Sequence, residues 1–403
     1  MNSENLFYNT IPSKLCKKVV VPTSKSYANR VLILAATNPS EVTIHHLPES
    51  SDVKNMLKCF SKIGLDVEHR NDSVIIKNSF PECEKISSEV INLNTGDGGT
   101  TNRFLIPLLA LGKNKYNLIP AEKMSQRPME EMEKILLSLG VNIFNEDNWF
   151  CLQGPYQTDF KSIEVDCTET TQFATGFMLS LQKINIDVSE KNLKTSVPYL
   201  LMTKELVKSL KNSYTVPVDF SSLSYPLALG LFNGEVHVPN CVEIDKYQAD
   251  SVFIKIIKDL GAVITINETG LKLKGLDQVE CFEVDCSDCP DLVPTLCFVA
   301  SYANGSSYMR NVDVLKFKEC DRLSEMQRIM SLFNVTCSYD EENDVLCVVG
   351  REPISKEVEV VTERDHRMVM IGHLFQRFNG GGILKNIDCV EKSFPKFFKE
   401  MNE

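Results

Sequence analysis

Six apolar runs in this 403-residue chain are each preceded by a short group of polar, charged or small residues. A helix that is apolar around most of its circumference is buried, and its start presents unpaired N–H groups and the positive end of the helix dipole. Taken alone, each group is better explained as a helix cap, but six such starts together favour binding of phosphate or carboxylate groups. The groups are Ser24 to Ser26, Gly96 to Thr101, Thr170 to Gln172, Ser221 and Ser222, Asp288 to Asp291, and Asp365 to Arg367.

Basic side chains accompany two of these helix starts. Ser26 and Arg30 are four residues apart, so they share one helix face beside Lys25. Arg103 follows the glycine-rich stretch Gly96 to Gly99 in the same way. That stretch is not a nucleotide-binding P-loop, which would end in Gly-Lys-Ser/Thr. The cations therefore indicate small anionic ligands rather than a known nucleotide motif.

A second kind of helix is predicted to position these starts. Four segments place apolar residues eight, five, four and one positions before a Gly or Asn, at Gly64, Gly140, Gly261 and Asn334. The spacing puts four side chains on one helical stripe, and the Gly or Asn supplies the left-handed residue that ends a helix. Two short apolar strands joined by turn residues follow each segment. The pattern predicts a repeated helix–strand–hairpin–strand unit, arranged in two similar domains.

Composition limits the class of protein. The net charge of −11 disfavours a nucleic-acid surface, although a few converging cations can still bind a small anion. The N-terminus shows no basic region followed by an apolar stretch, and the apolar run from Phe104 to Leu111 is too short to span a bilayer. We therefore expect a cytoplasmic protein with no membrane partner and no nucleic-acid partner.

The chain contains 14 cysteines, and a protein without a secretory signal is expected to keep them as reduced thiols. Cys286 and Cys289 form a C-x-x-C pair, with Cys281 and Cys297 nearby. A zinc site usually shows two such pairs, and Cys297 lies inside an apolar run. Structural thiols are therefore expected here rather than a metal site.

Six motifs follow one another from about residue 20 to the C-terminus. They are Ser-Lys-Ser-x-x-Asn-Arg at Ser24 to Arg30, Gly-Thr-x-x-Arg at Gly99 to Arg103, Arg-Pro-Met at Arg127 to Met129, Lys-Glu-x-Asp-Arg-Leu at Lys318 to Leu323, Asp-His-Arg-Met at Asp365 to Met368, and Lys-x-Phe-Pro at Lys392 to Pro395. In this order they give the chain a specific resemblance to the 5-enolpyruvylshikimate-3-phosphate synthase (3-phosphoshikimate 1-carboxyvinyltransferase) family.

The resemblance implies an α/β (α+β) fold, a two-domain inside-out α/β barrel of the enolpyruvyl transferase type. Repeated βαβαββ units surround buried parallel helices in each lobe. Lobe I is expected to contain residues 1–22 and 219–403, and lobe II residues 23–218, with the active site in the cleft between them. The segment from Ser196 to Asp219 has no room for a hairpin, so one repeat near 211–218 is expected to be shortened.

The activity implied by the resemblance is transfer of the enolpyruvyl group of phosphoenolpyruvate to the 5-hydroxyl of shikimate 3-phosphate, in chorismate and aromatic amino acid biosynthesis. The reaction passes through a tetrahedral intermediate and uses no metal and no organic cofactor. Two anions have to be held together with water excluded and proton-transfer groups supplied. A monomer is expected.

By resemblance, the sequence also assigns site residues. Asp291 would take the proton of the 5-hydroxyl, whereas Glu319 and Lys25 would exchange protons with the reacting carbon. Which of those two donates the proton stays open. The phosphoenolpyruvate ligands would be Lys25, Gly99, Arg127, Gln172, Arg322, Arg367 and Lys392. The shikimate 3-phosphate ligands would be Ser26, Arg30, Thr170, Thr171, Gln172, Ser196, Asp291 and Lys318.

Several positions depart from the family pattern, and they leave alternatives open. Val314 stands where many members carry an Asn for the acceptor, so an enolpyruvyl transferase with a different acceptor is one alternative. A catalytically silent binding homologue is another. The related transferase that acts on UDP-N-acetylglucosamine usually carries a cysteine ahead of its Arg-Pro motif, and none lies between Cys83 and Cys151. The other departures are Thr23 for Gly, Asp97 for Asn, Thr170 and Thr171 for two Ser, and Val197 for Lys.

Overall fold

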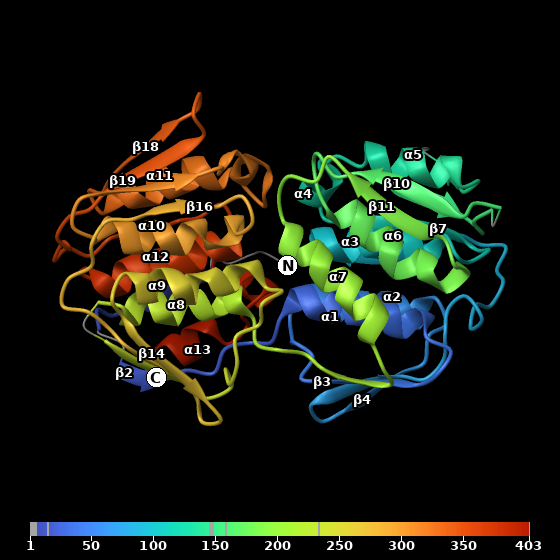
Figure 1. Cartoon of the computed structure of the whole chain (residues 1–403), viewed down its shortest axis with the longest axis horizontal. Helices are drawn as coiled ribbons and strands as arrows, with labels where there is room; N and C mark the ends of the chain where they lie inside the picture. The colour runs from blue at the N-terminus through green and yellow to red at the C-terminus, as the bar shows by residue number, and fades with distance from the viewer. Residues whose placement is uncertain (1–5, 14–15, 145–148, 158, 233, 403) are drawn as a thin grey trace. The chain divides into compact units, whose positions relative to one another are not determined.

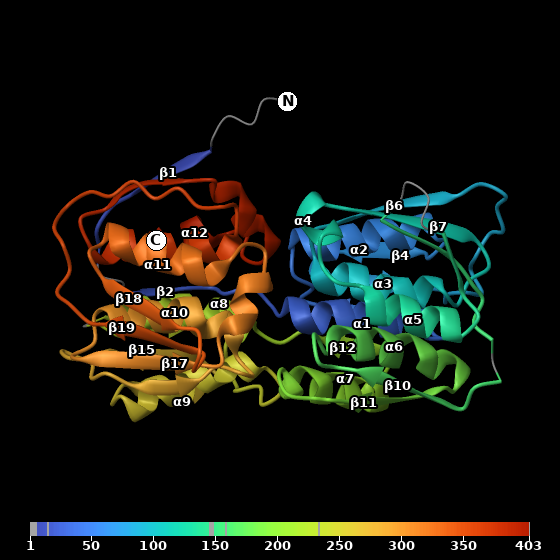
Figure 2. The same ribbon diagram turned by 90° about the horizontal axis from the view of Figure 1, so that it is seen from above.

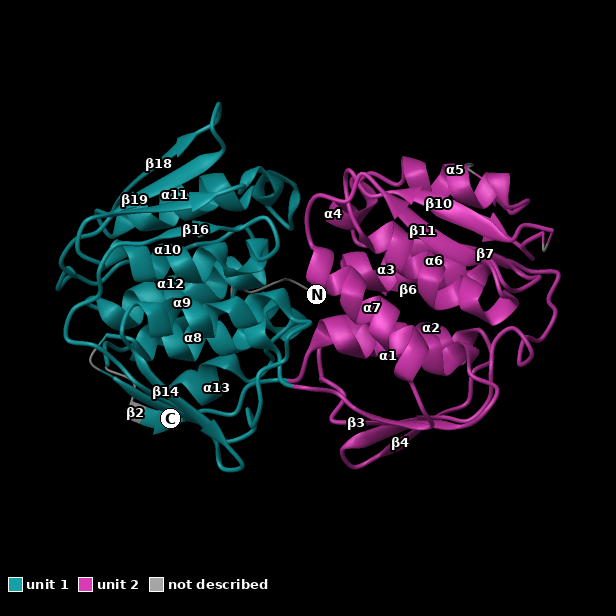
Figure 3. Ribbon diagram, in the orientation of Figure 1, with its two compact units in different colours: residues 1–22, 218–403 teal, residues 23–217 magenta. Residues whose placement is uncertain are grey.

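The computed structural model describes residues 6–13, 16–144, 149–157, 159–232 and 234–402. The chain divides into two compact units, of which unit 1 contains residues 1–22 and 218–403 and unit 2 contains residues 23–217 (Figure 3). The second crossing thus lies one residue before the position expected from the sequence. Among the described residues, no helix combines the length and the apolar character that crossing a membrane requires.

Unit 2 is built on three sheets in its described part, each containing a pair of parallel strands. Two sheets continue into an antiparallel hairpin and have the strand orders β12-β3-β5-β4 and β6-β7-β9-β8, whereas the third contains only β10 and β11. The strands are β3 (Val42–His45), β4 (Val67–Arg70), β5 (Ser73–Ile76), β6 (Ile91–Gly96), β7 (Lys115–Pro120), β8 (Asn142–Phe144), β9 (Phe150–Gln153), β10 (Ser162–Asp166), β11 (Asp187–Lys191) and β12 (Ser213–Thr215).

The three inner helices of unit 2 contact one another and lie side by side in two perpendicular views (Figures 1 and 2). They are α1 (Lys25–Thr37), α3 (Gly99–Leu109) and α6 (Gln172–Leu181). Gly176 allows the closest approach, because a Cβ atom at this position would lie 2.5 Å from the Arg103 carbonyl oxygen on α3. The remaining helices are α2 (Ser51–Lys62), α4 (Glu122–Ser125), α5 (Glu130–Ser138), η1 (Gln182–Ile184) and α7 (Val197–Ser209).

Unit 1 repeats the same plan. Two four-stranded sheets have the orders β14-β15-β13-β2 and β16-β17-β19-β18, and β1 pairs antiparallel with β20 in a third sheet. The strands are β1 (Phe7–Thr10), β2 (Cys16–Lys18), β13 (Glu235–Val238), β14 (Val263–Asn267), β15 (Gly270–Lys274), β16 (Glu283–Asp285), β17 (Ser306–Arg310), β18 (Thr336–Asp340), β19 (Val345–Val349) and β20 (Gly382–Lys385).

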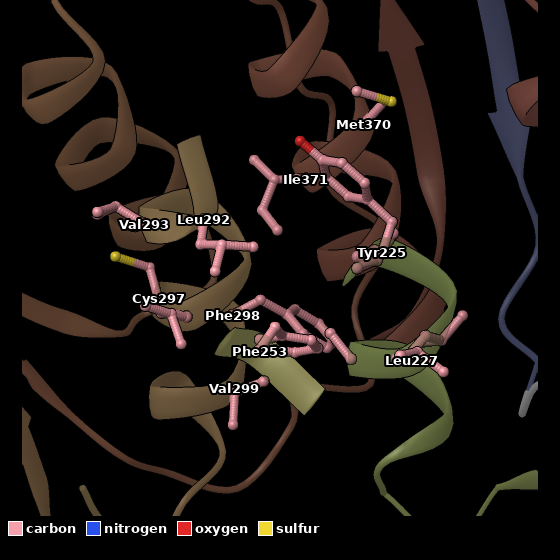
Figure 4. Packing of buried hydrophobic residues seen from close by; sticks show 14 of the residues in the cluster. Tyr225, Leu227, Phe253, Leu292, Val293, Cys297, Phe298, Val299, Met370 and Ile371 are labelled. Atoms are coloured by element: carbon pink, nitrogen blue, oxygen red, sulfur yellow. The ribbon is translucent and has the colours of Figure 1, made fainter. Parts of the chain in front are cut away.

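The inner helices of unit 1 also contact one another. They are α8 (Phe220–Gly230), α10 (Val293–Ser301) and α12 (His366–Phe378). Their apolar side chains form the core shown in Figure 4, where the ring of Phe298 lies among neighbouring helices and is fully buried. Burial of one such side chain contributes about 1.5–3 kcal/mol. The other helices are η2 (Ala249–Ser251), α9 (Val252–Asp259), η3 (Pro290–Leu292), η4 (Asp313–Phe317), α11 (Arg322–Leu332), η5 (Ile387–Lys392) and α13 (Phe397–Asn402).

The predicted repeat corresponds to the outer helices α2, α5, α9 and α11. Each ends just before a residue with positive φ, at Gly64 (101°), Gly140 (78°), Gly261 (106°) and Asn334 (59°). Gly and Asn tolerate this left-handed conformation, which stops the helix and turns the chain into the following strand. The predicted apolar stripes face inward, so the fold class and the internal repeat are confirmed.

The third repeat of unit 2 is the short one. After α7, the chain forms β12, which pairs parallel with β3 and therefore completes the first sheet of the unit. Among the described residues no strand pairs with the outer edge of β11. A hollow of about 450 Å³ borders this strand, with Val188 of β11 and Val207 of α7 in its lining.

Candidate active site

The starts of the three inner helices of unit 1 lie at one end of the unit. The hydroxyl groups of Ser224 on α8 and Thr295 on α10 are 2.9 Å apart, which joins the N-terminal halves of these helices. At the start of α12, Arg367 Nη2 lies 2.8 Å from Oδ2 of Asp291, the residue on η3 just before α10. Three predicted helix starts are therefore brought together, although they are far apart in the sequence.

A single guanidinium group connects the predicted catalytic residues of unit 1. Arg322, the first residue of α11, is 1% exposed. Its Nη1 lies 2.9 Å from Asp291 Oδ1, its Nη2 lies 2.5 Å from Glu319 Oε2, and its Nε lies 2.8 Å from Asp365 Oδ2. Burial opposes the charge, but these carboxylates raise the pKa of Arg322 above its ordinary value. The arrangement fixes three acidic side chains around one permanent positive charge.

Asp291 is surrounded by cations. Besides Arg322 and Arg367, Lys318 places Nζ 3.6 Å from Asp291 Oδ1. Burial opposes ionisation of this carboxyl, but the attraction of Arg367, Lys318 and Arg322 outweighs burial and holds the pKa of Asp291 well below its usual value. A carboxylate that stays ionised at neutral pH can accept a proton from a bound hydroxyl group.

Glu319 has a second cationic partner. Lys392, at the end of η5, places Nζ 3.0 Å from Glu319 Oε1, and the side chains of the two residues are 7% and 17% exposed. We call the set Asp291, Lys318, Glu319, Arg322, Asp365, Arg367 and Lys392 the unit 1 cluster. Its four basic side chains are paired with its three acidic ones, so a bound anion would have to replace some of these internal partners.

The starts of the inner helices of unit 2 also lie at one end of that unit. The Asn29 side chain on α1 donates to the Thr100 hydroxyl on α3 at 2.7 Å. Arg103 on α3 donates through Nη1 to Gln172 Oε1, on the first residue of α6, at 3.0 Å. These two contacts join the N-terminal halves of α1, α3 and α6.

Lys25 begins α1 and forms an ion pair with a buried carboxylate. Its Nζ lies 2.8 Å from Asp52 Oδ2, and the two side chains are 23% and 1% exposed. Ser24 caps α1, because its hydroxyl accepts from the Tyr27 amide. Asp52 lies in the first turn of α2, so the ion pair joins the starts of an inner and an outer helix and holds the ammonium group in place.

Arg30 is buried within unit 2, and burial lowers its pKa to about 10. Its Nε donates to the Thr203 hydroxyl at 2.8 Å, and its Nη2 donates to the Tyr199 carbonyl at 3.2 Å, both on α7. Its Nη1 donates to the Ser26 carbonyl at 2.8 Å. The guanidinium group therefore ties α1 to the start of α7, and part of its donor capacity is used inside the unit.

Gly99 forms a tight corner with two predicted ligands. A Cβ atom at Gly99 would lie 2.9 Å from Arg127 Nη1 and 3.1 Å from Gln172 Oε1. Arg103 supports the same corner, since its Nη2 donates to the Pro128 carbonyl at 3.1 Å. Burial, with repulsion from Arg127 added, lowers the pKa of Arg103 to about 10. We call Lys25, Gly99, Arg127 and Gln172, with Asp52 and Arg103, the unit 2 cluster.

The hydroxyl residues predicted to bind the acceptor lie at the starts of α6 and α7, which contact each other. The Thr170 hydroxyl accepts from the Gln172 amide at 3.2 Å, and Thr171 is buried. Ser196 caps α7 in the left-handed conformation, with φ 58°, and makes no cap hydrogen bond through its side chain. These hydroxyl groups therefore belong to the same end of unit 2 as Ser26.

Sequence reasoning did not identify Asp52, Asp250 or Tyr225 as neighbours of the site. Asp52 belongs to an outer helix, for which only the apolar stripe was informative. Asp250 is fully buried beside the start of α8. Tyr225 lies inside an apolar run, where burial raises its pKa to about 12 and the charge of Arg367 opposes that effect. No local pattern distinguishes these residues, because their partners are distant in the sequence.

The described residues include no group of three or more His, Cys, Asp or Glu side chains placed to hold a metal ion. Of the cysteines considered in the sequence, Cys286, Cys289 and Cys297 are buried free thiols and Cys281 is exposed. Burial contributes to raising the pKa of Cys297 well above its usual value, as expected for a thiol packed in the core.

Comparison with known proteins identifies relatives along nearly the whole chain. Residues 9–212 and 180–401 match the model of the family described as EPSP synthase (3-phosphoshikimate 1-carboxyvinyltransferase). A 3-phosphoshikimate 1-carboxyvinyltransferase of Nitrosopumilus maritimus is 27% identical, with 97% of this chain and 96% of the relative covered. The enzyme of the same name from Thermococcus kodakarensis is 28% identical, with 94% and 95% covered.

Solved structures share the fold. The EPSP synthase of Acinetobacter baumannii has a TM-score of 0.78 at 21% identity and covers 99% of this chain, with 98% of its own chain covered. The enolpyruvyl transferase NikO of Streptomyces tendae has a TM-score of 0.73 at 13% identity, with 99% of this chain and 97% of that chain covered. At these identities the structural likeness concerns the fold alone.

Proposed function

The chain belongs to the EPSP synthase family, and we propose on this premise that it is a 3-phosphoshikimate 1-carboxyvinyltransferase. It transfers the enolpyruvyl group of phosphoenolpyruvate to the 5-hydroxyl of shikimate 3-phosphate and releases phosphate. The observation that best supports this function is the arrangement around Arg322, which holds Asp291 and Glu319 at 2.9 and 2.5 Å.

In this proposal Asp291 is the base for the acceptor hydroxyl. Its pKa is held well below the usual value, with burial opposing and Arg367, Lys318 and Arg322 favouring the charge, so it enters the reaction ionised. The 5-hydroxyl oxygen attacks the central carbon of phosphoenolpyruvate while the methylene carbon gains a proton. The tetrahedral intermediate then loses a proton from the new methyl group together with phosphate, which restores the double bond.

Cations of the unit 1 cluster would hold phosphoenolpyruvate by exchanging partners. Arg367 and Lys392 are paired with Asp291 and Glu319 at 2.8 and 3.0 Å. A carboxylate or phosphate group of the substrate can take the place of either internal carboxylate, and the guanidinium groups can bind it through two hydrogen bonds. The release of Glu319 from Lys392 would free its carboxylate for proton exchange with the methylene carbon.

The unit 2 cluster would supply the remaining contacts. Lys25 would either donate the proton or stabilise the transferring group, while Gly99, Arg127 and Gln172 contact phosphoenolpyruvate. Ser26, Thr170, Thr171 and Ser196, with Lys318 of unit 1, would bind the phosphate or the ring hydroxyls of the acceptor. Arg30 is proposed to act in part by fixing the start of α7.

The reaction itself can be measured directly. Phosphate release from phosphoenolpyruvate would be followed with and without shikimate 3-phosphate, and the product would be identified by NMR. We expect acceptor-dependent release and an enolpyruvyl ether at the 5-oxygen. Lys25→Met and Glu319→Gln should each abolish turnover, and circular dichroism would establish that both variants remain folded.

Absence of release from a folded chain that still binds phosphoenolpyruvate would contradict the proposed acceptor. Val314, Thr170 and Thr171 would then be the first positions to change to the family residues. Recovery of turnover in a Val314→Asn variant would assign the loss to acceptor recognition rather than to the enolpyruvyl chemistry.

A further inference from the structure

Asp250 is a buried carboxyl group that the proposed mechanism does not use. It lies on η2, beside the start of α8, and is 1% exposed. Oδ2 accepts a hydrogen bond from the Ser221 hydroxyl, whereas Oδ1 has no hydrogen-bond partner among the described residues. A buried polar atom without a hydrogen-bond partner costs folding free energy, so the presence of this carboxyl group in the core needs an explanation.

The position of Asp250 is fixed by its neighbours in the chain. Gln248, which is also buried, accepts from the Phe220 amide at 3.1 Å and donates to the Val218 carbonyl at 2.8 Å. Both contacts hold η2 against the start of α8. Asp250 therefore has little freedom to move away from the charged groups that it faces.

The charged groups that interact electrostatically with Asp250 lie around the starts of the three inner helices of unit 1. They are Arg367 at the start of α12, Asp291 on η3 and Asp219 at the cap of α8, with the Cys289 thiol just before η3. Arg367 is the positive group among them. Its Nη2 binds Asp291 at 2.8 Å, whereas its buried Nε has no hydrogen-bond partner among the described residues. Asp250 and Asp291 therefore share the electrostatic field of one guanidinium group.

We propose that Asp250 is a positioning residue that acts through Arg367. A negative charge on Asp250 offsets part of the positive charge with which the Arg367 guanidinium group attracts Asp291 and the anionic substrate. The inference rests on the function proposed above. A neutral Asp250 leaves the Arg367 charge available to the carboxylate or phosphate of phosphoenolpyruvate. An ionised Asp250 adds a negative charge beside the same group and weakens that interaction.

The protonation of Asp250 should change near neutral pH. Burial, followed by repulsion from Asp291, raises its pKa to about 7, against the opposing effects of Arg367 and the Ser221 hydrogen bond. The carboxyl is therefore neutral at acidic pH and becomes charged as the pH rises through this value. Substrate affinity should consequently weaken over the same range.

The test compares kcat/KM for phosphoenolpyruvate in the whole chain and in Asp250→Asn from about pH 5.5 to about pH 9, a range that brackets the transition. At each pH the kcat/KM of the variant is divided by that of the unmodified protein, because the effect of substrate ionisation is the same for both and cancels in this ratio. We expect this kcat/KM ratio to be near one at low pH and to rise roughly tenfold through neutral pH. A tenfold change is the order of magnitude expected when one charge is added near another in a partly buried site. Asp259→Asn removes an exposed carboxylate from the same segment and should leave the ratio flat.

Ser221→Ala provides a second test. Loss of its hydrogen bond should raise the pKa of Asp250, so the inflection should move to higher pH. A pH-independent ratio for Asp250→Asn would overturn the proposal. If that variant does not fold, an unmoved inflection in Ser221→Ala would overturn it instead. Failure of the proposed function can be distinguished from failure of this inference, since the unmodified chain would then show no acceptor-dependent phosphate release at any pH.

Discussion

The buried guanidinium group of Arg322 and the carboxylate of Asp365 form an ion pair in which Nε lies 2.8 Å from Oδ2, with side chains 1% and 0% exposed. Asp365 also caps α12, because its Oδ1 accepts from the Arg367 amide at 2.8 Å. One side chain thus joins the start of α11 to the start of α12 and presents both arginines to the same site.

Asp365→Ala should destabilise the protein strongly. The change removes a helix cap and leaves Arg322 buried with one fewer carboxylate, and loss of one partner of a buried pair costs about 3–5 kcal/mol. Urea unfolding would measure the change in the free energy of unfolding. Asp321→Ala is a matched control, since Asp321 caps α11 through an exposed side chain and its loss should cost only about 1 kcal/mol. Equal losses in the two variants would contradict the buried network.

Asp291 should contribute stability that disappears in acid. Burial opposes its charge, but Arg367, Lys318 and Arg322 lower its pKa in the folded chain. The unfolded carboxyl titrates near 4, so the contribution is fully present above about pH 4 and is lost as the pH falls through the lowered pKa. Unfolding free energies measured at several pH values should fall less steeply with acid in Asp291→Asn than in the unmodified chain.

The lowered pKa of Asp291 also determines how turnover should depend on pH. Since Asp291 remains ionised well into acid, its protonation should not produce an inflection in kcat/KM at or above about pH 4. An inflection in that range that disappears in Asp291→Glu, measured by phosphate release, would show that the carboxyl titrates closer to neutrality than its surrounding cations imply.

Lys25 and Asp52 allow catalysis and stability to be separated. Lys25→Met should abolish turnover and also destabilise unit 2, because Asp52 remains 1% exposed without its ion-pair partner at 2.8 Å. The double variant Lys25→Met/Asp52→Asn removes the unpaired charge, so it should recover most of the lost stability without recovering activity. Thermal unfolding and phosphate release would be measured on the three proteins, and recovery of turnover in the double variant would argue against a direct role for Lys25.

Much of this architecture is predictable from local patterns. The stripe of Met56, Cys59, Phe60 and Ile63 predicts α2, and Gly64 with φ 101° ends it as expected. The six polar starts correspond to the inner helices because apolar runs bury themselves and leave polar caps at their ends. The apolar stripes, the helix-ending glycines and the polar helix starts each extend over only a few residues, so each can be recognised within its own segment of sequence.

The long-range contacts were not predictable. Arg30 binds Thr203, which is 173 residues away, and β12 pairs with β3 rather than with its neighbours in sequence. Asp52 and Asp250 belong to segments whose polar residues look like ordinary surface positions. Their importance arises only when tertiary packing excludes water from a carboxyl group and brings a cation to it.

Gly99→Ala should weaken phosphoenolpyruvate binding selectively. A methyl group there would lie 2.9 Å from Arg127 Nη1 and 3.1 Å from Gln172 Oε1, so both side chains would have to shift. A misplacement of this size in positioning groups can cost roughly a hundredfold, and we expect the KM for phosphoenolpyruvate to rise at least about tenfold. The KM for shikimate 3-phosphate should rise less, because Gln172 is also a predicted acceptor ligand but Ser26 and Ser196 lie on other helix starts. Steady-state kinetics with each substrate varied in turn would measure both values, and equal increases in the two would indicate a general distortion of α3 instead.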